Sequence, residues 1–164
     1  MNRTTQRLGL LAILVFSFWA CAAGISSQAR SQVTFFDSFQ QLQEQPEQYR
    51  GETAMLGGKI VSVRVEAGVT ELVVLQLAMG NGTRPTDNDK SQGRFLVRSA
   101  QFMDPAIYPQ GTLITVVGRI MGSETRDIGQ MPYRYPVIDV IELKKWPADG
   151  QPRFHFGVGV GTRF

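Results

Sequence analysis

The chemistry available to this chain is limited by its two rarest reactive side chains. The 164-residue sequence contains one cysteine, Cys21, and one histidine, His155. A single cysteine cannot form a disulfide within the chain, and a single histidine is a poor basis for a His-ligated metal site or a Ser-His-Asp triad. Cys21 therefore has the most distinctive chemistry, because its thiol can be alkylated by a lipid donor at a membrane surface.

The segment before Cys21 is organised like a secretory signal peptide. Arg3 and Arg7 give a positively charged start, and Leu8–Trp19 is a largely apolar run of twelve residues. Such a run is shorter than the roughly 20 residues that span a bilayer. It has the length of the apolar region of a signal sequence. We therefore predict that residues 1–20 are a lipoprotein signal peptide.

The surroundings of Cys21 resemble the lipobox of bacterial lipoproteins. Ala20 precedes the cysteine, whereas Phe18 and Trp19 are larger than the residues usual at their positions. In such proteins the cysteine carries acyl chains, each contributing about 0.8 kcal/mol per buried CH₂ to membrane binding. We predict that Cys21 is acylated, with palmitate among its chains, and binds the protein to the membrane. The alternative is cleavage after Ala22, which would release a soluble ligand- or protein-binding module.

A tether and a short helix are predicted after the cysteine. Residues 21–34 comprise the lipidated N-terminus and the small, polar stretch Ala22–Gln32. We predict a flexible tether there, because the stretch offers too little apolar surface to pack. A helix is predicted over Phe39–Glu44, where Asp37 or Ser38 can cap the first turn.

The domain at residues 35–146 is dominated by strand patterns. Gly80–Gly93 and Ser123–Gln130 are predicted to be polar loops. Short strands bent at glycines predict a mainly β fold, a five- to six-stranded OB-like barrel, with a β-sandwich as the alternative. Apolar runs and alternation between turn residues predict the strands at Thr53–Glu66, Val69–Ala78, Arg94–Ala100, Thr112–Met121 and Tyr133–Leu143.

Three features mark irregular points in these strands. Gly57 and Gly58 lie in the middle of the first strand and predict a bulge or a sharp bend. Pro136 predicts an edge or a bulge in the last strand, because proline cannot donate a ladder hydrogen bond. Glu66–Gly68 is predicted to be a hairpin turn.

Carboxylates offer the remaining catalytic chemistry. Glu71 and Asp104 are the candidates for an envelope enzyme, but the sequence places no second carboxylate beside either of them. Asp104 precedes Pro105, and this pair is typical of a capped, rigid connector. We therefore predict no enzyme activity, no catalytic residue and no cofactor.

Nucleic acid and metal ions are not expected partners. Arg94 and Arg98 share one strand face with Lys59 nearby, and such a face can bind single-stranded nucleic acid in an OB barrel. Removal of residues 1–20 takes two arginines from the 17 basic residues, which leaves 15 against 14 acidic ones, a charge of about +1. That balance argues against nucleic acid. The acidic loop at residues 86–90 lacks the spacing of a calcium loop, so no metal site is predicted.

The C-terminal segment, residues 147–164, is rich in glycine and phenylalanine. Phe156, Val158 and Val160 alternate with glycines, and the chain ends at Phe164. The alternation is consistent with a strand added to the barrel, with a strand lent to a partner protein by β-augmentation, or with an unpaired tail. We single out these four residues as a possible partner-contact strand.

The order and spacing of several short motifs resemble the starvation-inducible outer-membrane lipoprotein family, Slp. With Cys21, these motifs cover most of residues 46–146. The resemblance implies a non-catalytic outer-membrane lipoprotein of Gram-negative bacteria, facing the periplasm, with an envelope-structural, stress-related or partner-binding role and an envelope protein as partner. The motifs are GGKI at 57–60, ELVVLQL at 71–77, RP at 84–85, QGRFL at 92–96, FMDPAIY at 102–108, GTLITVVGRIMG at 111–122 and YRYPVI at 133–138.

Overall fold

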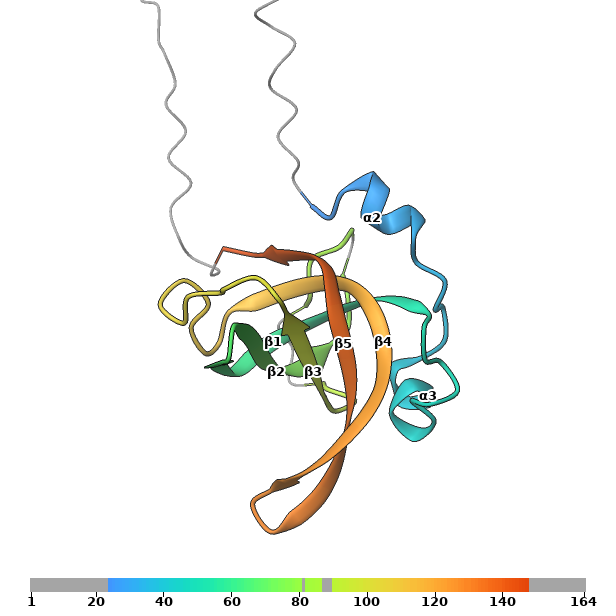
Figure 1. Cartoon of the computed structure of the whole chain (residues 1–164). Coiled ribbons are helices and arrows are strands. Elements are labelled where there is room, and N and C mark those ends of the chain that lie inside the picture. Colours follow the sequence, from blue (N-terminus) through green and yellow to red (C-terminus); the bar gives the residue numbers. More distant parts are fainter. Residues whose placement is uncertain (1–23, 81, 87–89, 148–164) are drawn as a thin grey trace, which may run out of the picture.

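A closed barrel of five strands forms the body of the molecule (Figure 1). The computed structural model describes residues 24–80, 82–86 and 90–147. The strands follow one another around the barrel in the order β1–β2–β3–β5–β4, and β4 pairs with β1 to close it. The elements are α2 (Ser27–Ser31), α3 (Phe39–Glu44), β1 (Thr53–Glu66), β2 (Val69–Leu77), β3 (Arg94–Ser99), β4 (Leu113–Ile128) and β5 (Met131–Lys145).

The strand pairing identifies the barrel as OB-like. All neighbours are antiparallel except β3 and β5, which run parallel with Leu96 opposite Val137. A five-stranded Greek-key barrel is the OB architecture, so the prediction of an OB-like, mainly β barrel is confirmed. The alternative β-sandwich is wrong, because every strand pairs with a neighbour on each side and the single sheet closes on itself. A sixth strand from residues 147–164 would lie outside the described residues.

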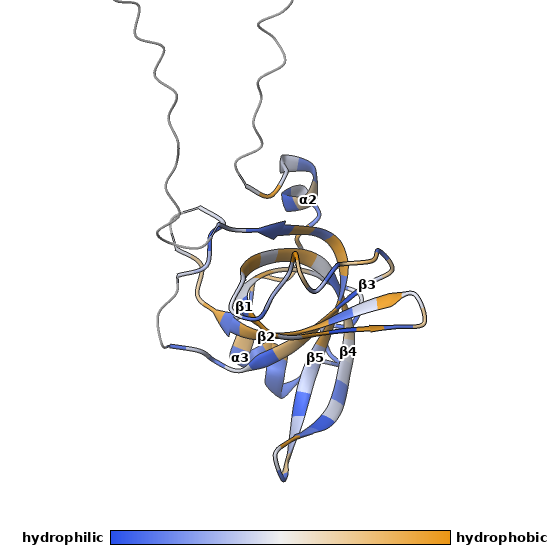
Figure 2. Ribbon diagram, turned by 90° about the vertical axis from the view of Figure 1, so that its left-hand side faces the viewer, coloured by the Kyte–Doolittle hydropathy of each residue, from blue (hydrophilic) through white to orange (hydrophobic). Residues whose placement is uncertain are grey.

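Apolar side chains fill the inside of the barrel. All five strands contribute to one core cluster, and α3 adds Phe39 and Leu42 to it. Each buried Phe or Leu contributes about 1.5–3 kcal/mol. Ser38 begins α3 with a capping box: its hydroxyl accepts from the Gln41 N–H, and the Gln41 side chain accepts from the Ser38 N–H. Figure 2 shows that hydrophobic residues lie mostly on the barrel strands, whereas the projecting part of the β4–β5 hairpin is mainly hydrophilic.

The bulge predicted at the glycine pair in β1 lies a few residues further along the strand. The register shift lies between Ile60 and Ser62, where Val61 has no partner on β2. Gly57 and Gly58 keep regular pairing with both neighbouring strands. A Cβ at Gly58 would lie 2.4 Å from the Leu75 carbonyl oxygen, so this glycine permits close approach of the two strands.

The other predicted irregularities are confirmed. The β4–β5 register shifts between Ile120 and Ser123, and Ser123 pairs with Pro136. Pro136 therefore lies next to a bulge. The β1–β2 hairpin turns through Ala67 and Gly68, whose φ angles are 47° and 82°, as a two-residue turn with positive φ requires.

The predicted loop at residues 123–130 is wrong. β4 continues to Ile128 and β5 begins at Met131, so the two strands form a long hairpin that turns at Gly129 with φ 65°. The sequence there lacks an apolar alternation because ion pairs of Glu124 and Arg126, rather than apolar burial, hold this part of β4.

The flexible tether predicted before the domain is wrong for its described part. Residues 27–31 form α2, and Ile25 and Ala29 are only 2% and 3% exposed. Both pack with Val117 of β4. Two small apolar residues suffice here because Ser26 adds polar contacts to the barrel. Within the described ranges, no helix has both the length and the apolar character needed to cross a membrane.

Candidate functional site

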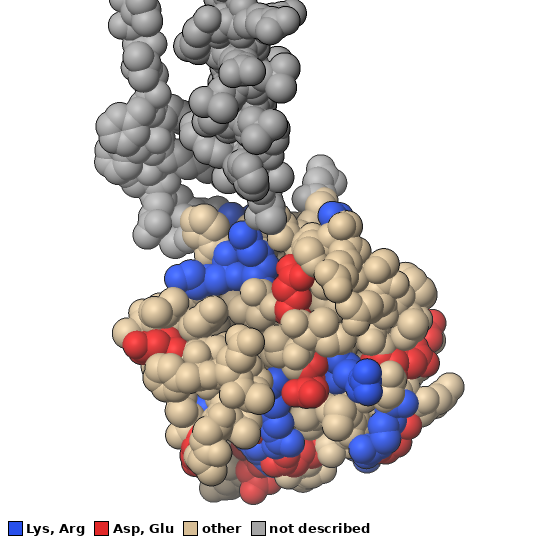
Figure 3. Space-filling model, turned by 45° about the horizontal axis from the view of Figure 1, so that its top comes forward, with Lys and Arg blue, Asp and Glu red and all other residues tan. Residues whose placement is uncertain are grey.

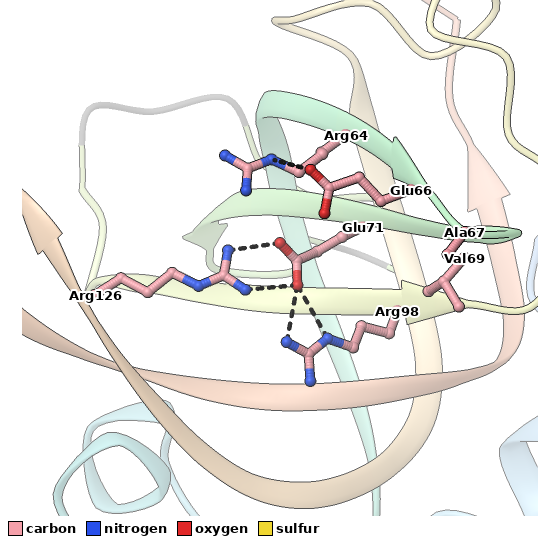
Figure 4. A pocket seen from close by; sticks show the side chains of 7 residues that line it. All are labelled: Arg64, Glu66, Ala67, Val69, Glu71, Arg98 and Arg126. Carbon is pink, nitrogen blue, oxygen red and sulfur yellow. Dashed lines mark hydrogen bonds and ion pairs between the residues drawn. The ribbon is translucent and has the colours of Figure 1, made fainter.

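A pocket of about 290 Å³ lies between the β1–β2 hairpin and the outer half of β4 (Figure 4). Three arginines and two glutamates dominate its wall, and two small apolar residues complete it. The strands β2 and β3 supply its floor, because Glu71 and Arg98 pair directly across these strands. Its lining residues are Arg64, Glu66, Ala67, Val69, Glu71, Arg98 and Arg126.

Glu71 is the centre of the charged cluster. Its side chain is only 12% exposed and binds two arginines. Arg126 makes a bidentate pair, with Nη1 at 2.6 Å from Oε1 and Nη2 at 2.8 Å from Oε2. Arg98 donates from Nε to Oε2 at 3.0 Å. Figure 4 shows both guanidinium groups directed at the same carboxylate.

Glu124 closes this cluster into a ring. Arg126 donates from Nε to Glu124 Oε1 at 2.7 Å, and Arg98 Nη2 pairs with Glu124 Oε2. Two carboxylates thus alternate with two guanidinium groups, and every member contacts two partners. We call Glu71, Arg98, Glu124 and Arg126 the charged ring. It joins β2, β3 and the outer part of β4, so it fixes the β4–β5 hairpin against the barrel.

The charged ring keeps its carboxylates ionised. The hydrogen bond from Arg126 lowers the pKa of Glu71, and burial opposes this only in part. The hydrogen bond from Arg126 likewise lowers the pKa of Glu124, and the two glutamates raise the pKa of Arg126. At neutral pH neither glutamate carries a proton that it could donate, which disfavours a general-acid role.

Arg64 and Glu66 form a looser pair at the mouth of the pocket. Their closest atoms, Arg64 Nε and Glu66 Oε1, are 3.7 Å apart, and both side chains are mostly exposed. Exposed pairs of this kind contribute little to stability. Of the charges in the pocket, these two are the ones that a bound partner can engage at the least cost in broken contacts.

The structure separates the two carboxylates considered for catalysis. Glu71 belongs to the charged ring, whereas Asp104 caps a turn, its Oδ1 accepting from the Ala106 N–H at 2.8 Å. Among the residues that the structure describes, no three His, Cys, Asp or Glu side chains are grouped so that they would hold a metal ion.

Only part of the predicted basic face enters the pocket. Arg98 is in the charged ring, whereas Arg94 is at the other end of β3, where its N–H donates to the Tyr133 hydroxyl at 2.7 Å. Lys59 pairs with Leu113 and Leu75 along the ladders and does not line the pocket. Each arginine that lines the pocket is paired with a glutamate.

Several predicted residues lie outside the described part of the chain. These are the lipidation residue Cys21, His155 and the possible partner-contact strand Phe156, Val158, Val160 and Phe164. Conversely, sequence reasoning missed Glu124 and Arg126, which were assigned to a loop. The pattern Glu-Thr-Arg-Asp was the available signal, because charges two residues apart share a face if the segment is a strand.

The fold and the pocket together define the class, a small OB-like barrel whose charged pocket adjoins its first hairpin. A family model described as "Outer membrane lipoprotein Slp family" matches residues 18–157. That is more than half of the chain, which therefore belongs to the outer membrane lipoprotein Slp family. The resemblance inferred from the motifs is confirmed, and with it the assignment to a family of outer-membrane lipoproteins.

Individual relatives support the assignment. The "Uncharacterized lipoprotein YeaY" of Escherichia coli K12 is 38% identical over 101 residues, which are 62% of this chain and 52% of that protein. This chain thus spans about half the length of that relative. The "Outer membrane protein Slp" of the same strain is 29% identical over 89% of this chain and 77% of that protein. An "Uncharacterized protein" of Haemophilus influenzae is 30% identical over 81% of this chain and 72% of that protein.

The solved structures that are similar in shape include a small single-stranded DNA-binding protein from Streptomyces coelicolor, with a TM-score of 0.38 and 14% identity over 58% of this chain and 94% of that chain. At this level of similarity the likeness says nothing of what the present chain binds.

Proposed function

We propose that this chain is a non-catalytic outer-membrane lipoprotein, anchored through acylated Cys21, whose barrel faces the periplasm and binds an envelope protein. Membership of the lipoprotein family supports the anchor. The partner-binding part rests on the pocket, because OB barrels bind their ligands with the face of β2 and β3 and the loops on either side of it. The pocket occupies that face.

The rim of the pocket favours a protein partner. Val69 lines the pocket and is 42% exposed. It lies among three arginines, and arginine is enriched at protein interfaces. Val65 and Phe102, which are 39% and 70% exposed, lie on the other face of the hairpin, because Val65 pairs with the buried Thr70 and the Met103 N–H donates to the Thr70 hydroxyl at 3.0 Å.

Site-specific photo-crosslinking in living cells tests this binding site. A photoreactive amino acid at Val69 is expected to give a crosslinked product of defined mass. The matched control is Phe36, which is 83% exposed and lies on the segment before α3. Equal products from both positions, or none from Val69, would contradict the proposed site.

The anchor is tested separately by fractionation. The wild-type chain is expected in the outer-membrane fraction after high-salt washing, and a Cys21→Ser variant is expected to lose its processing. The alternative, a soluble module released by cleavage after Ala22, predicts a wild-type protein in the soluble periplasmic fraction.

We also propose that Phe156, Val158, Val160 and Phe164 extend the contact with the partner as an added strand. A chain that ends at Pro147 keeps every described element, so it is expected to fold and to reach the membrane. Its crosslinked product from Val69 should be weaker than that of the full chain. An unchanged yield would show that the tail does not contribute.

A further inference from the structure

The segment just after the proposed lipidation site is attached to the barrel. The Ser26 N–H donates to Glu142 Oε1 at 2.9 Å, and the Ser26 hydroxyl donates to Glu142 Oε2 at 2.5 Å. The same hydroxyl accepts from the Ala29 N–H at 3.1 Å and so caps α2. We call this contact of Ser26 with Glu142 the latch. It fixes both the start of α2 and its place on β5.

Apolar burial reinforces the latch. Ile25 and Ala29, on either side of Ser26, are almost completely buried against Val117 of β4. Val33 and Met55 pack at the edge of the same cluster. Full burial of an aliphatic side chain stabilises such a contact by about 1.5–3 kcal/mol. α2 is therefore part of the folded domain and does not act as a free linker.

The docked helix shortens the connection between the lipid and the barrel. From Cys21 to Ser26 the chain advances five residues, which span at most about 17 Å. A free tether that ran from Cys21 to Thr34 would span up to about 45 Å. The lipid on Cys21 is thus held close to one particular end of the barrel.

That end also carries the last described residues. Both ends of the described chain lie at the top of the view in Figure 1. A Cβ built on Gly24 would lie 2.9 Å from the Thr83 hydroxyl. The Thr83 carbonyl accepts from Thr115, whose hydroxyl in turn accepts from Trp146 Nε1 at 2.9 Å. The start of the described chain and Trp146 are therefore connected through Thr83 and Thr115.

The side chains at this end suit a phospholipid surface. Figure 3 shows Lys and Arg gathered beside the points where the described chain ends. Arg84 Nη2 donates to the Pro147 carbonyl at 3.0 Å and lies over the Trp146 ring. Lys144 and Arg30 lie close enough to Glu142 to add to the lowering of its pKa by the hydrogen bonds from Ser26. Tryptophan and basic residues are the side chains that favour the headgroup region of a bilayer.

We propose that the latch holds the end of the barrel that carries α2 and Trp146 directly against anionic phospholipid headgroups. The inference rests on the proposed anchor at Cys21. The β4–β5 hairpin lies at the opposite end in Figure 1, so it points away from the membrane and into the envelope.

The experiment uses the acylated full-length protein in vesicles of phosphatidylethanolamine and phosphatidylglycerol that carry a quencher on the headgroups. Cys21 is the only cysteine, and its acylated sulfur does not react with thiol reagents. A fluorophore can therefore be placed at Pro147→Cys, an exposed position beside Trp146 at the end of β5, or at Met131→Cys, which is at the tip of the hairpin and 73% exposed. We expect stronger quenching at position 147 than at position 131.

Latch variants show whether the docking sets this orientation. The double variant Ser26→Ala and Glu142→Gln is expected to lose the difference between the two positions and to keep its thermal unfolding transition. Glu66→Gln is the matched control, because its pair with Arg64 is exposed and lies in the pocket, away from α2. This control should retain the difference.

The outcomes separate this inference from the proposed anchor. Equal quenching at both positions of the wild-type protein bound to vesicles would overturn the orientation. An undiminished difference in the double variant would overturn the role of the latch. A wild-type protein that lacks acyl mass and does not sediment with vesicles would instead overturn the anchor itself.

Discussion

Glu71 shows how a single side chain can organise a surface site. It accepts hydrogen bonds from two arginines, and Glu124 completes their pairing. Both carboxylates of the charged ring are paired with guanidinium groups, so Glu71 serves rigidity. Under the proposed function, the exposed charges of Arg64 and Glu66 are the ones that contact a partner.

Replacement of Glu71 by glutamine should weaken the domain. The new amide would be neutral, so Arg98 and Arg126 would face each other with only Glu124 between them. We expect a loss of about 1–3 kcal/mol, the usual cost of unpairing partly buried charged groups. Urea denaturation measures it, with Glu66→Gln as the control. Equal stability of the two variants would show that the charged ring is not structural.

The charged ring also predicts an acid-sensitive contribution to stability. The pKa values of Glu71 and Glu124 are lower in the folded protein than in the unfolded chain. Their contribution is therefore complete above the unfolded value of about 4.3. It is lost as the pH falls through the lower folded values. Urea midpoints of the wild type should decline below about pH 4.3 more steeply than those of Glu71→Gln. Parallel curves would refute this.

At the scale of the element, the apolar periodicity of the sequence predicted those strands and helices that are stabilised by burial of apolar side chains. The five strands and α3 carry apolar patterns, and each was placed within a few residues of its observed bounds, apart from the outer half of β4. That half escaped prediction because Glu124 and Arg126 are held by charges that come from β2 and β3. α2 escaped it because a helix of five residues has no periodicity to detect, and Glu142 lies 116 residues from Ser26.

The close approach of β1 and β2 gives a prediction at this scale. A Cβ at Gly58 would also lie 2.5 Å from Val74 Cγ1, besides its contact with the Leu75 carbonyl. Gly58→Ala must therefore push the two strands apart, and we expect a cost of about 1–3 kcal/mol. Thermal unfolding compares it with Ser62→Ala, an exposed position of the same strand. A Gly58→Ala variant as stable as this control would argue against the contact.

At the scale of the whole molecule, the two ends of the barrel carry different elements. α2 and the end of β5 lie at one end of the barrel, and the tip of the β4–β5 hairpin lies at the other (Figure 1). A lipid on Cys21 would place the first end at the membrane. The charged ring fixes the projecting hairpin, so the same barrel can hold the pocket at a defined distance from the bilayer.

The proposed orientation of the barrel relative to the membrane depends on the anchor at Cys21. The most direct test is the intact mass of the protein extracted from the membrane fraction of a Gram-negative host, beside a Cys21→Ser variant. We predict a wild-type chain that begins at Cys21 and carries acyl mass, and a variant that keeps its signal segment and carries none. A wild-type chain that begins after Ala22 and is found in the soluble periplasmic fraction would contradict the account.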